Sequence, residues 1–283
     1  MTIEDIILNN DRRGVSKLRG HLPPNFTQEA AQLILDNPGN AIITTGFYIF
    51  ACKAPETDGP PGAIAIGRAL QALKYKVTYV TDRFAAPLMT SLIGKEAKVV
   101  DFPITDHEAS KKFASNLLKE IKPTVLISIE RCGLTKDGTY LNMRGIDISE
   151  FNAKVDYLFD GTKPSVGIGD GGNEIGMGNL ASVIPSIETL PKNPCVTKVN
   201  KLVITSVSNW GGYGLAAALS LVKGKNLLLS VEEEQKLVKR SADMGAVDGI
   251  LNKPAYGADG FPLEEHSAPL RELHALLKQK KIA

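Results

Sequence analysis

Short, continuously apolar runs rich in valine and isoleucine recur along the chain, and longer stretches of mixed polarity separate them. Runs that stay apolar on both sides of the backbone are typical of parallel strands buried on both faces. The pattern therefore predicts six strands, at Ala41–Thr45, Lys76–Thr81, Ala97–Phe102, Thr124–Ile129, Ser165–Gly169 and Lys201–Val207.

The intervening stretches carry apolar residues at the spacing of amphipathic helices. They predict helices over Gly62–Leu73, Pro87–Gly94, His107–Ile121, Gly212–Val222, Val231–Met244 and His266–Lys280. Asp106 stands in an N-cap position for the third helix, and Pro123 ends that helix before the next strand. This alternation predicts an α/β fold: a doubly wound, mostly parallel sheet with helices on both faces, a Rossmann-like three-layer sandwich. No repeat or low-complexity linker interrupts it, so we expect residues 1–283 to form one domain.

Composition and charge narrow the class of partner. Hydrophobic residues make up 43% of the chain and charged residues 23%, which is typical of a soluble protein. The formal net charge of +2 creates no large field, so neither nucleic acid nor a membrane surface is an expected partner. No apolar run approaches the roughly 20 residues that span a bilayer. We expect a small-molecule substrate, and the sequence leaves open whether the protein is a homo-oligomer.

The N-terminal residues and the cysteines indicate the cellular compartment of the protein. The first residues, MTIEDIILNNDRRG, lack the charged-then-apolar pattern of a secretory signal. Cys52, Cys132 and Cys195 are widely spaced and odd in number, which argues against a disulfide framework. These features predict a cytoplasmic protein.

The densest local signal is a glycine-rich run that begins in the fifth predicted strand. Six glycines fall between Gly167 and Gly178, and Asp170, Asn173 and Glu174 stand among them. Glycine allows left-handed torsions and close approach of the backbone to a ligand, at a cost in conformational entropy. We therefore interpret the run as part of a binding pocket, in which Gly171 and Gly172 would contact the substrate.

Polar residues also follow the other predicted strands, and the carboxyl ends of parallel strands are where ligands bind. Candidate residues at these ends are Glu56, Asp58, Glu130, Arg131 and Asn209. Glu56 and Asp58 either cap the helix that starts near Gly62 or contact ligand, and one residue can do both. Glu130 and Arg131 either form a structural ion pair or serve the site, and we favour a functional role for Glu130.

Several kinds of chemistry have no support in the sequence. The four histidines (His21, His107, His266 and His274) lie outside the glycine-bearing loops and have the pattern of exposed or helix-surface residues. No GxSxG or GxxxxGK[ST] motif occurs. Gly167-x-Gly169-x-x-Gly172 matches the dinucleotide fingerprint only in spacing, and Lys53 is a lone loop lysine. We therefore expect no nicotinamide, flavin or pyridoxal phosphate.

The remaining candidates are oxygen donors. Glu130, Asp170 and Glu174, with Asn173 and Asn209 as amides, are ligands that suit magnesium or manganese. Such an ion would polarise a substrate carboxylate or phosphate. The amides of the glycine run would form an anion nest, helped by a helix N-terminus near Asn173.

Five segments together resemble the domain family found at the C-terminal end of D-glutamate cyclase: TGFYIFACKAPETDGPPGA, VTD, SIERCG, GIGDGGNEIGMG and SNWGGYG. The resemblance covers the chain from about Leu18 to its C-terminus. It implies a lyase acting on an amino acid or small acid, with conversion of D-glutamate to 5-oxo-D-proline, with loss of water, as the first reaction to test.

The candidate residues can be assigned roles in that reaction. Asp170, Glu174 and Glu130 would hold an ion or transfer protons, and Arg131 would bind the second carboxylate bidentately. Asn209 and the glycine amides would orient oxygens. Two alternatives use the same residues: a magnesium- or manganese-dependent phosphate-ester hydrolase, and a non-catalytic metabolite- or nucleotide-binding module.

Overall fold

The computed structural model describes residues 1–282, which are built around a six-stranded parallel sheet. The strand order is β5-β4-β1-β6-β7-β8. The strands are β1 (Asn40–Thr44), β4 (Lys76–Thr81), β5 (Lys98–Asp101), β6 (Val125–Ile129), β7 (Ser165–Gly169) and β8 (Lys201–Ile204). All six were predicted to within three residues at each end, because strands buried on both faces leave a continuous apolar signature.

The chain winds outward from the centre of the sheet in both directions. It runs from β1 through β4 to β5, then returns to the other side of β1 and adds β6, β7 and β8. The order therefore reverses between β1 and β6, which is the point where doubly wound folds bind ligands beyond the carboxyl ends of the strands. The predicted fold class is confirmed.

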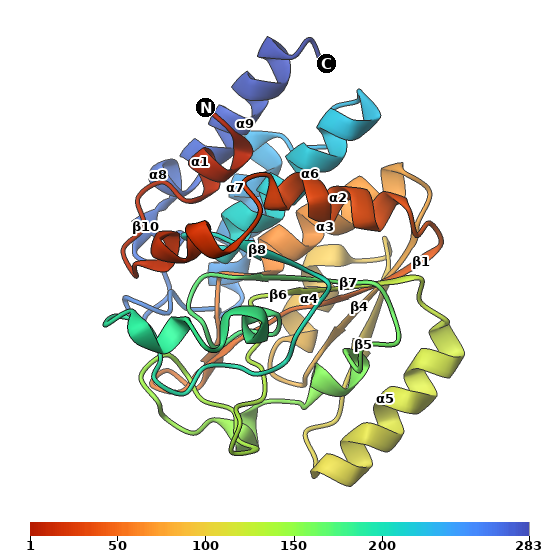
Figure 1. Cartoon of the computed structure of the whole chain (residues 1–283), viewed down its shortest axis with the longest axis vertical. Coiled ribbons are helices and arrows are strands. Elements are labelled where there is room, and N and C mark those ends of the chain that lie inside the picture. Colours follow the sequence, from red (N-terminus) through yellow and green to blue (C-terminus); the bar gives the residue numbers. More distant parts are fainter. Residues whose placement is uncertain (283) are drawn as a thin grey trace.

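Helices cover both faces of this sheet (Figure 1). They are α1 (Ile3–Ile7), α2 (Phe26–Leu35), α3 (Pro60–Ala72), α4 (Ala86–Ile93), α5 (His107–Ile121), α6 (Ser208–Lys223), α7 (Val231–Asp243), α8 (Leu263–His266) and α9 (Ala268–Gln279). The sequence missed α1, α2 and α8. Asp106 caps α5 as predicted, because its carboxylate accepts the amide hydrogen of Ala109 at 2.8 Å.

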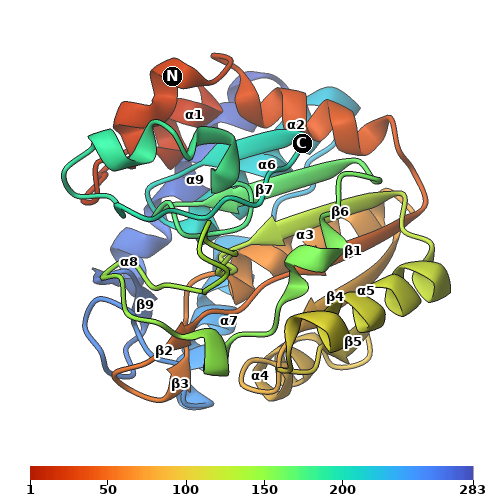
Figure 2. The ribbon, with the colours of Figure 1, turned by 60° about the horizontal axis from the view of Figure 1, so that its bottom comes forward.

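Alternating residues of β1 serve two hydrophobic cores, one on each face of the sheet. In β1, Ala41 and Ile43 pack into the larger core with α2, α3 and α6, whereas Ile42 faces the smaller core. Helix α5 and the 3₁₀ turn η3 (Val155–Leu158) close that second face. Figure 2 shows α5 on the opposite side of the sheet from α1 and α2.

Two close contacts bring distant parts of the chain to one edge of the sheet. A Cβ atom on Gly212 of α6 would lie 2.8 Å from the Cα atom of Gly62 in α3, so the first turns of these helices pack backbone to backbone. Helix α1 also packs against α9, so the two ends of the chain meet. Short ribbons complete this edge: β2 (Tyr48–Ile49) with β3 (Ala54–Pro55), and β9 (Gly257–Ala258) with β10 (Phe261–Pro262).

Candidate active site

A cavity of about 140 Å³ lies beyond the carboxyl ends of β1, β6 and β7. An engineered protein cavity of about 150 Å³ accepts benzene, so this volume suits a small metabolite. Acidic, basic, amide and apolar groups all contribute to the wall. The lining residues are Arg13, Phe47, Tyr48, Ile49, Phe50, Ala51, Glu56, Glu130, Asn142, Met143, Arg144, Ile146, Asp170, Asn173, Glu174, Gly249, Ile250 and Asn252.

Glu130 occupies the strained position of this site. It follows β6 directly and has a φ of +44°, in the left-handed region that a residue with a side chain rarely adopts. Its side chain is buried and accepts a hydrogen bond from the Ser208 hydroxyl at 2.5 Å. Burial, with the neighbouring charges of Glu174 and Asp58, raises the pKa of Glu130 well above its usual range. Glu130 therefore holds a proton more tightly than an exposed glutamate does.

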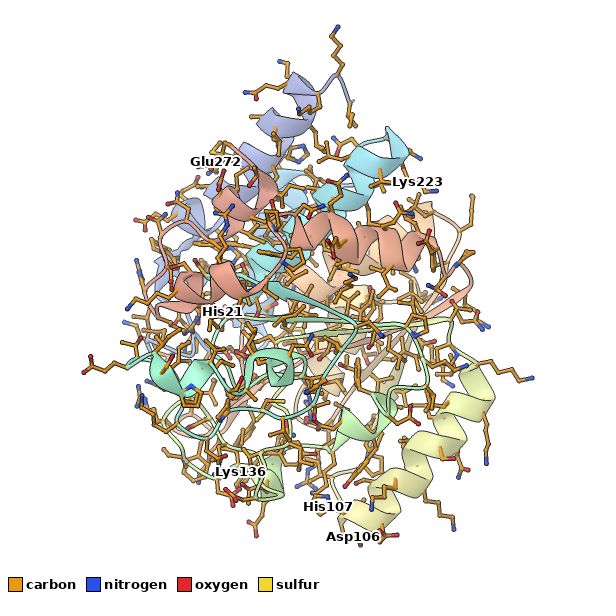
Figure 3. All side chains as sticks on the ribbon, viewed as in Figure 1. His21, Asp106, His107, Lys136, Lys223 and Glu272 are labelled. Carbon is orange, nitrogen blue, oxygen red and sulfur yellow. The ribbon has the colours of Figure 1, made fainter. Side chains whose placement is uncertain are left out.

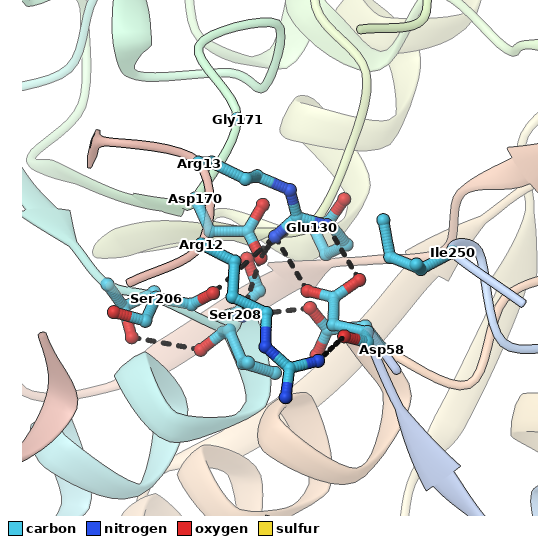
Figure 4. Close-up of polar contacts among 12 residues, drawn as sticks. Arg12, Arg13, Asp58, Glu130, Asp170, Gly171, Ser206, Ser208 and Ile250 are labelled. Carbon is cyan, nitrogen blue, oxygen red and sulfur yellow. Dashed lines mark hydrogen bonds and ion pairs between the residues drawn. The ribbon is translucent and has the colours of Figure 1, made fainter. Parts of the chain in front are cut away.

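Asp170 lies at the end of β7 and is paired with an arginine from the N-terminal segment. A guanidinium nitrogen of Arg13 is 2.8 Å from Asp170 Oδ2, and the same side chain binds both oxygens of Asp259, at 2.6 and 2.7 Å (Figure 4). The amide of Ser208 also donates to Asp170 Oδ2, at 3.1 Å. Despite Arg13, burial raises the pKa of Asp170 well above its usual range.

The carboxylate of Glu174 occupies the space that side chains on the surrounding glycines would fill. Its carboxylate accepts the amide hydrogens of Gly171 and Gly172, both at 2.7 Å. A Cβ atom on Gly169 or Gly171 would lie within 3.0 Å of Glu174 oxygens. The anion nest predicted for a ligand is therefore occupied by the protein's own carboxylate. The predicted helix N-terminus near Asn173 is also wrong, since only a 3₁₀ turn (Met177–Leu180) follows.

Asp58 and Asn209 lie behind the cavity and do not line it. The Asp58 carboxylate accepts the amide hydrogens of Ser208 and Asn209, each at 2.8 Å. Asp58 thus caps α6, not the helix that follows it in sequence. Asn209 caps that helix instead: its carbonyl oxygen accepts the amide hydrogens of Gly59 and Gly62 at 3.0 and 2.8 Å.

The two remaining candidates, Glu56 and Arg131, lie in different parts of the structure. Glu56 is buried, lines the cavity and lies against Gly249, where a side chain would overlap its carboxylate. Arg131 lies elsewhere: it pairs with Asp82 at 2.6 Å and donates to the carbonyl oxygen of Gly46. These contacts hold Arg131 inside the protein, so we do not retain it as a substrate clamp. Adjacent residues leaving a strand point in opposite directions, which accounts for its separation from Glu130.

One histidine contradicts the expectation from sequence. His21 is exposed and His107 is half-buried near the bottom of the molecule in Figure 3, but His266 is fully buried. Its Nδ1 lies 2.7 Å from a carboxylate oxygen of Glu234, and its Nε2 lies 3.3 Å from the side-chain nitrogen of Asn209. His266 was missed because its neighbours come from α6 and α7, distant in sequence. Trp210 and Tyr213 pack beside it in the core, behind the cavity.

Around the cavity, buried carboxyl groups greatly outnumber buried cations. Burial and the charge of Asp259 raise the pKa of Glu56 well above its usual range and that of Asp58 to about 7. Burial alone would also raise the pKa of Asp259, but its ion pair with Arg13 lowers it. Among Glu56, Asp58 and Asp259, only Asp259 therefore has a lowered pKa, whereas burial favours the protonated form of the other two.

The sequence identified five acidic or amide residues that the fold does bring to one cavity: Glu56, Glu130, Asp170, Asn173 and Glu174. One oxygen from each of Glu130, Asp170 and Glu174 lies within 4.8 Å of the others, and Asp58, Asp170 and Asp259 form a second such group. Oxygen donors at this spacing fit a hard divalent cation. Sequence reasoning missed Arg13 and Asp259, which carry no local motif, and it assigned no role to Ser208, which begins the segment SNWGGYG.

An acid-lined cavity at the carboxyl ends of a doubly wound sheet defines a small-molecule-binding α/β domain. The family model for D-glutamate cyclase-like C-terminal domains matches residues 3–274. The chain belongs to this family.

Comparison with individual proteins adds one relative in sequence. The chain is 34% identical over 222 residues to human D-glutamate cyclase, a mitochondrial protein; the match covers 72% of this chain and 36% of that protein. The chain thus corresponds to little more than a third of its relative.

Two solved structures show weaker likeness. An exopolyphosphatase-related protein from Bacteroides fragilis aligns with 93% of this chain and 58% of its own, at 10% identity and a TM-score of 0.43. A short-chain oxidoreductase from Burkholderia thailandensis aligns with 47% of this chain and 52% of its own, at 16% identity and a TM-score of 0.28. Neither likeness bears on function. Among residues 1–282, no helix combines the length and apolar character needed to cross a bilayer.

Proposed function

We propose that this chain catalyses the cyclisation of D-glutamate to 5-oxo-D-proline with loss of water. The observation that carries the proposal is the pair Glu130 and Asp170, two buried carboxyl groups with raised pKa values facing one small cavity. Family membership supports the choice of reaction. Because the chain matches only part of its human relative, its activity on its own is part of the proposal.

The reaction moves two protons from nitrogen to oxygen. The substrate ammonium loses one proton to become a nucleophile, and its nitrogen attacks the side-chain carboxyl carbon. A C–N bond forms and a C–O bond breaks; the nitrogen loses a second proton, and the departing oxygen leaves as water. Carboxyl groups whose pKa values lie near the working pH can both donate and accept these protons. We assign Asp170 and Glu130 to this transfer.

The surrounding contacts keep the pair in position. Arg13 holds Asp170 from one side, and the Ser208 hydroxyl holds Glu130 from the other. Glu174 fixes the glycine loop between them through the amides of Gly171 and Gly172. Glu174 therefore acts in this proposal chiefly as a positioning residue.

A magnesium or manganese ion held by Glu130, Asp170 and Glu174 is a second part of the proposal. Bound there, such an ion would polarise the substrate carboxylate as a Lewis acid. We do not pursue the phosphate-ester hydrolase, because the glycine amides expected to bind phosphate already bind Glu174. We also propose a reducing, cytoplasmic compartment, since Cys52, Cys132 and Cys195 are all free thiols.

The test is a chiral assay of D-glutamate and 5-oxo-D-proline with the purified chain, run with manganese, with magnesium and with a chelator. We expect turnover, and a loss on the order of 10²-fold in Asp170→Asn and Glu130→Gln. The exposed Asp36 at the end of α2 provides the matched control, Asp36→Asn. Absence of turnover from the folded wild type, with or without metal, would refute the proposal. Stabilisation by D-glutamate without turnover would instead indicate a binding module.

A further inference from the structure

The cavity wall contains two arginines with different surroundings. Arg13 is occupied by Asp170 and by both oxygens of Asp259. Arg144 is exposed, and within residues 1–282 its guanidinium makes no ion pair or hydrogen bond. Arg144 is therefore the cation of the cavity wall whose donors are available to a ligand.

The backbone that carries Arg144 is held in a fixed turn. The side-chain oxygen of Asn142 accepts the amide hydrogens of Arg144 and Ile146, at 2.9 and 3.0 Å. Gly145 completes the turn with a φ of +75°. The turn projects from an irregular hairpin in which Leu141 pairs with Asp147. A fixed turn bearing a free guanidinium at the cavity is suited to capture of a carboxylate.

A second group of the same wall lacks a partner. Asn173 is 3% exposed, and its side-chain nitrogen donates to the carbonyl oxygen of Leu141 at 3.2 Å. That bond orients the amide, and among the described residues its Oδ1 accepts no hydrogen bond. A buried acceptor left without a donor costs free energy. A donor on a ligand would satisfy it, and an amine or lactam nitrogen carries such a hydrogen.

We propose that Arg144 and Asn173 select the substrate: Arg144 binds the carboxylate that does not react, and the Asn173 carbonyl oxygen accepts a hydrogen from the substrate nitrogen. This assignment rests on the proposed function and adds a binding orientation to it. The non-reacting carboxylate lies toward the exposed Arg144, because the inner wall is lined by Glu56, Glu130 and Asp170 and its one cation, Arg13, is already paired. The reacting carboxyl group then points inward to those acids.

Two ligand analogues separate the two contacts. The α-amide of D-glutamate lacks the non-reacting carboxylate, and glutarate lacks the nitrogen. Binding of D-glutamate and both analogues is measured by calorimetry, and turnover is measured separately. We expect Arg144→Gln to raise the KM and Kd for D-glutamate about tenfold or more, with kcat changed less than about threefold. The Arg144→Gln variant should no longer prefer D-glutamate to the α-amide, but it should still prefer D-glutamate to glutarate.

Matched variants complete the design. Arg144→Lys keeps the charge and should recover part of the preference, whereas Arg83→Gln, an exposed arginine outside this cavity, should behave as wild type. Asn173→Ala should lose the preference over glutarate, and Asn173→Asp, which keeps an acceptor, should retain it. If Asn173→Ala does not fold, Asn173→Asp and the Arg144 variants still decide the assignment.

The outcomes distinguish the two proposals. Turnover with an equal effect of Arg144→Gln on D-glutamate and on its α-amide overturns the role of Arg144 and leaves the cyclase function intact. Unaltered preference over glutarate in a folded Asn173→Ala overturns the role of Asn173. Selective binding of D-glutamate without turnover overturns the cyclase function and supports the two recognition contacts.

Discussion

Asp58 caps the helix that contains Asn209, and Asn209 caps the helix that Asp58 precedes. The Asp58 carboxylate, just before α3, accepts the amide hydrogen of Asn209 at 2.8 Å in the first turn of α6. The Asn209 carbonyl oxygen in turn accepts the amide hydrogens of Gly59 and Gly62 at the start of α3. Both side chains are buried, so this exchange satisfies backbone donors that water cannot reach. This exchange fixes the starts of α3 and α6, on which the positions of the buried acids Asp58, Glu130 and Asp170 depend.

Truncation of this exchange should destabilise the fold. Asn209→Ala leaves the amides of Gly59 and Gly62 without their acceptor, and we expect the free energy of unfolding to fall by about 2–3 kcal/mol. Denaturant titration measures the change. Asn25→Ala is the matched control, since Asn25 is exposed at the N-cap of α2 and its side chain makes no cap hydrogen bond. A loss in Asn209→Ala no larger than in the control would contradict the capping role.

The orientation of Asn209 predicts the tautomer of His266. The Asn209 oxygen already accepts two amide hydrogens, so its nitrogen faces His266 Nε2 as a donor. Nε2 must then be an acceptor, and the proton lies on Nδ1, toward Glu234 at 2.7 Å. Nitrogen-15 NMR of the imidazole should show that Nδ1 of His266 carries a proton and that Nε2 does not. A proton on Nε2 would show that the Asn209 amide is turned the other way.

Backbone strain at Glu130 predicts an opposition between stability and activity. Glycine adopts a φ of +44° without the steric cost that a side chain incurs, which is about 1 kcal/mol. Glu130→Gly and Glu130→Ala both remove the acid and its hydrogen bond with Ser208, so both should lose activity, but Glu130→Gly should be more stable than Glu130→Ala by roughly 1 kcal/mol. Thermal and denaturant unfolding of the two variants provide the comparison. Lower stability in Glu130→Gly would mean that the left-handed backbone is not strained.

The raised pKa of Asp58 predicts that stability declines as pH rises. In the folded protein this pKa is about 7, against an ordinary value of 3.8, so the folded state holds the proton more tightly than the unfolded state. The resulting stabilisation is complete below about pH 4 and is lost as the pH rises through about 7. Glu56, Glu130 and Asp170 shift in the same direction.

The measurement is the free energy of unfolding of wild type and Asp58→Asn between pH 5 and pH 8. Wild type should lose stability across this window, and Asp58→Asn should lose less, because asparagine has no proton to release. Asp36→Asn, at an exposed position, should keep the wild-type slope. Equal slopes in wild type and Asp58→Asn would exclude the proposed protonation of Asp58.

Much of the sheet could be predicted because its strands carry their own signal. The apolar runs at β1, β4 and β6 needed only local residues to be recognised, and the parallel arrangement then placed Glu130 and Asp170 at one edge. Glu174 was assigned to the cavity correctly, but its task of binding the glycine amides depends on a backbone geometry that spacing does not specify.

The residues that sequence reasoning missed are brought together by contacts between distant parts of the chain. Arg13 and Asp259 are 246 positions apart, and each belongs to a short irregular segment with no periodic pattern. His266 and Glu234 meet only because α7 and α8 pack against α6. Such pairs are set by tertiary packing, so no local window contains them. Arg131 shows the converse error: its proximity to Glu130 in the chain suggested a shared site, but the two side chains diverge.

The pairing of Arg13 with Asp170 and Asp259 also has a consequence for the order of events during synthesis. Arg13 is synthesised 246 residues before Asp259, and in the folded protein its guanidinium binds both Asp170 and Asp259. A chain that has completed all six strands still lacks Asp259, the ionised partner of this arginine. The arginine bridge between Asp170 and Asp259 can therefore form only after the segment that contains Asp259 has been synthesised and has docked.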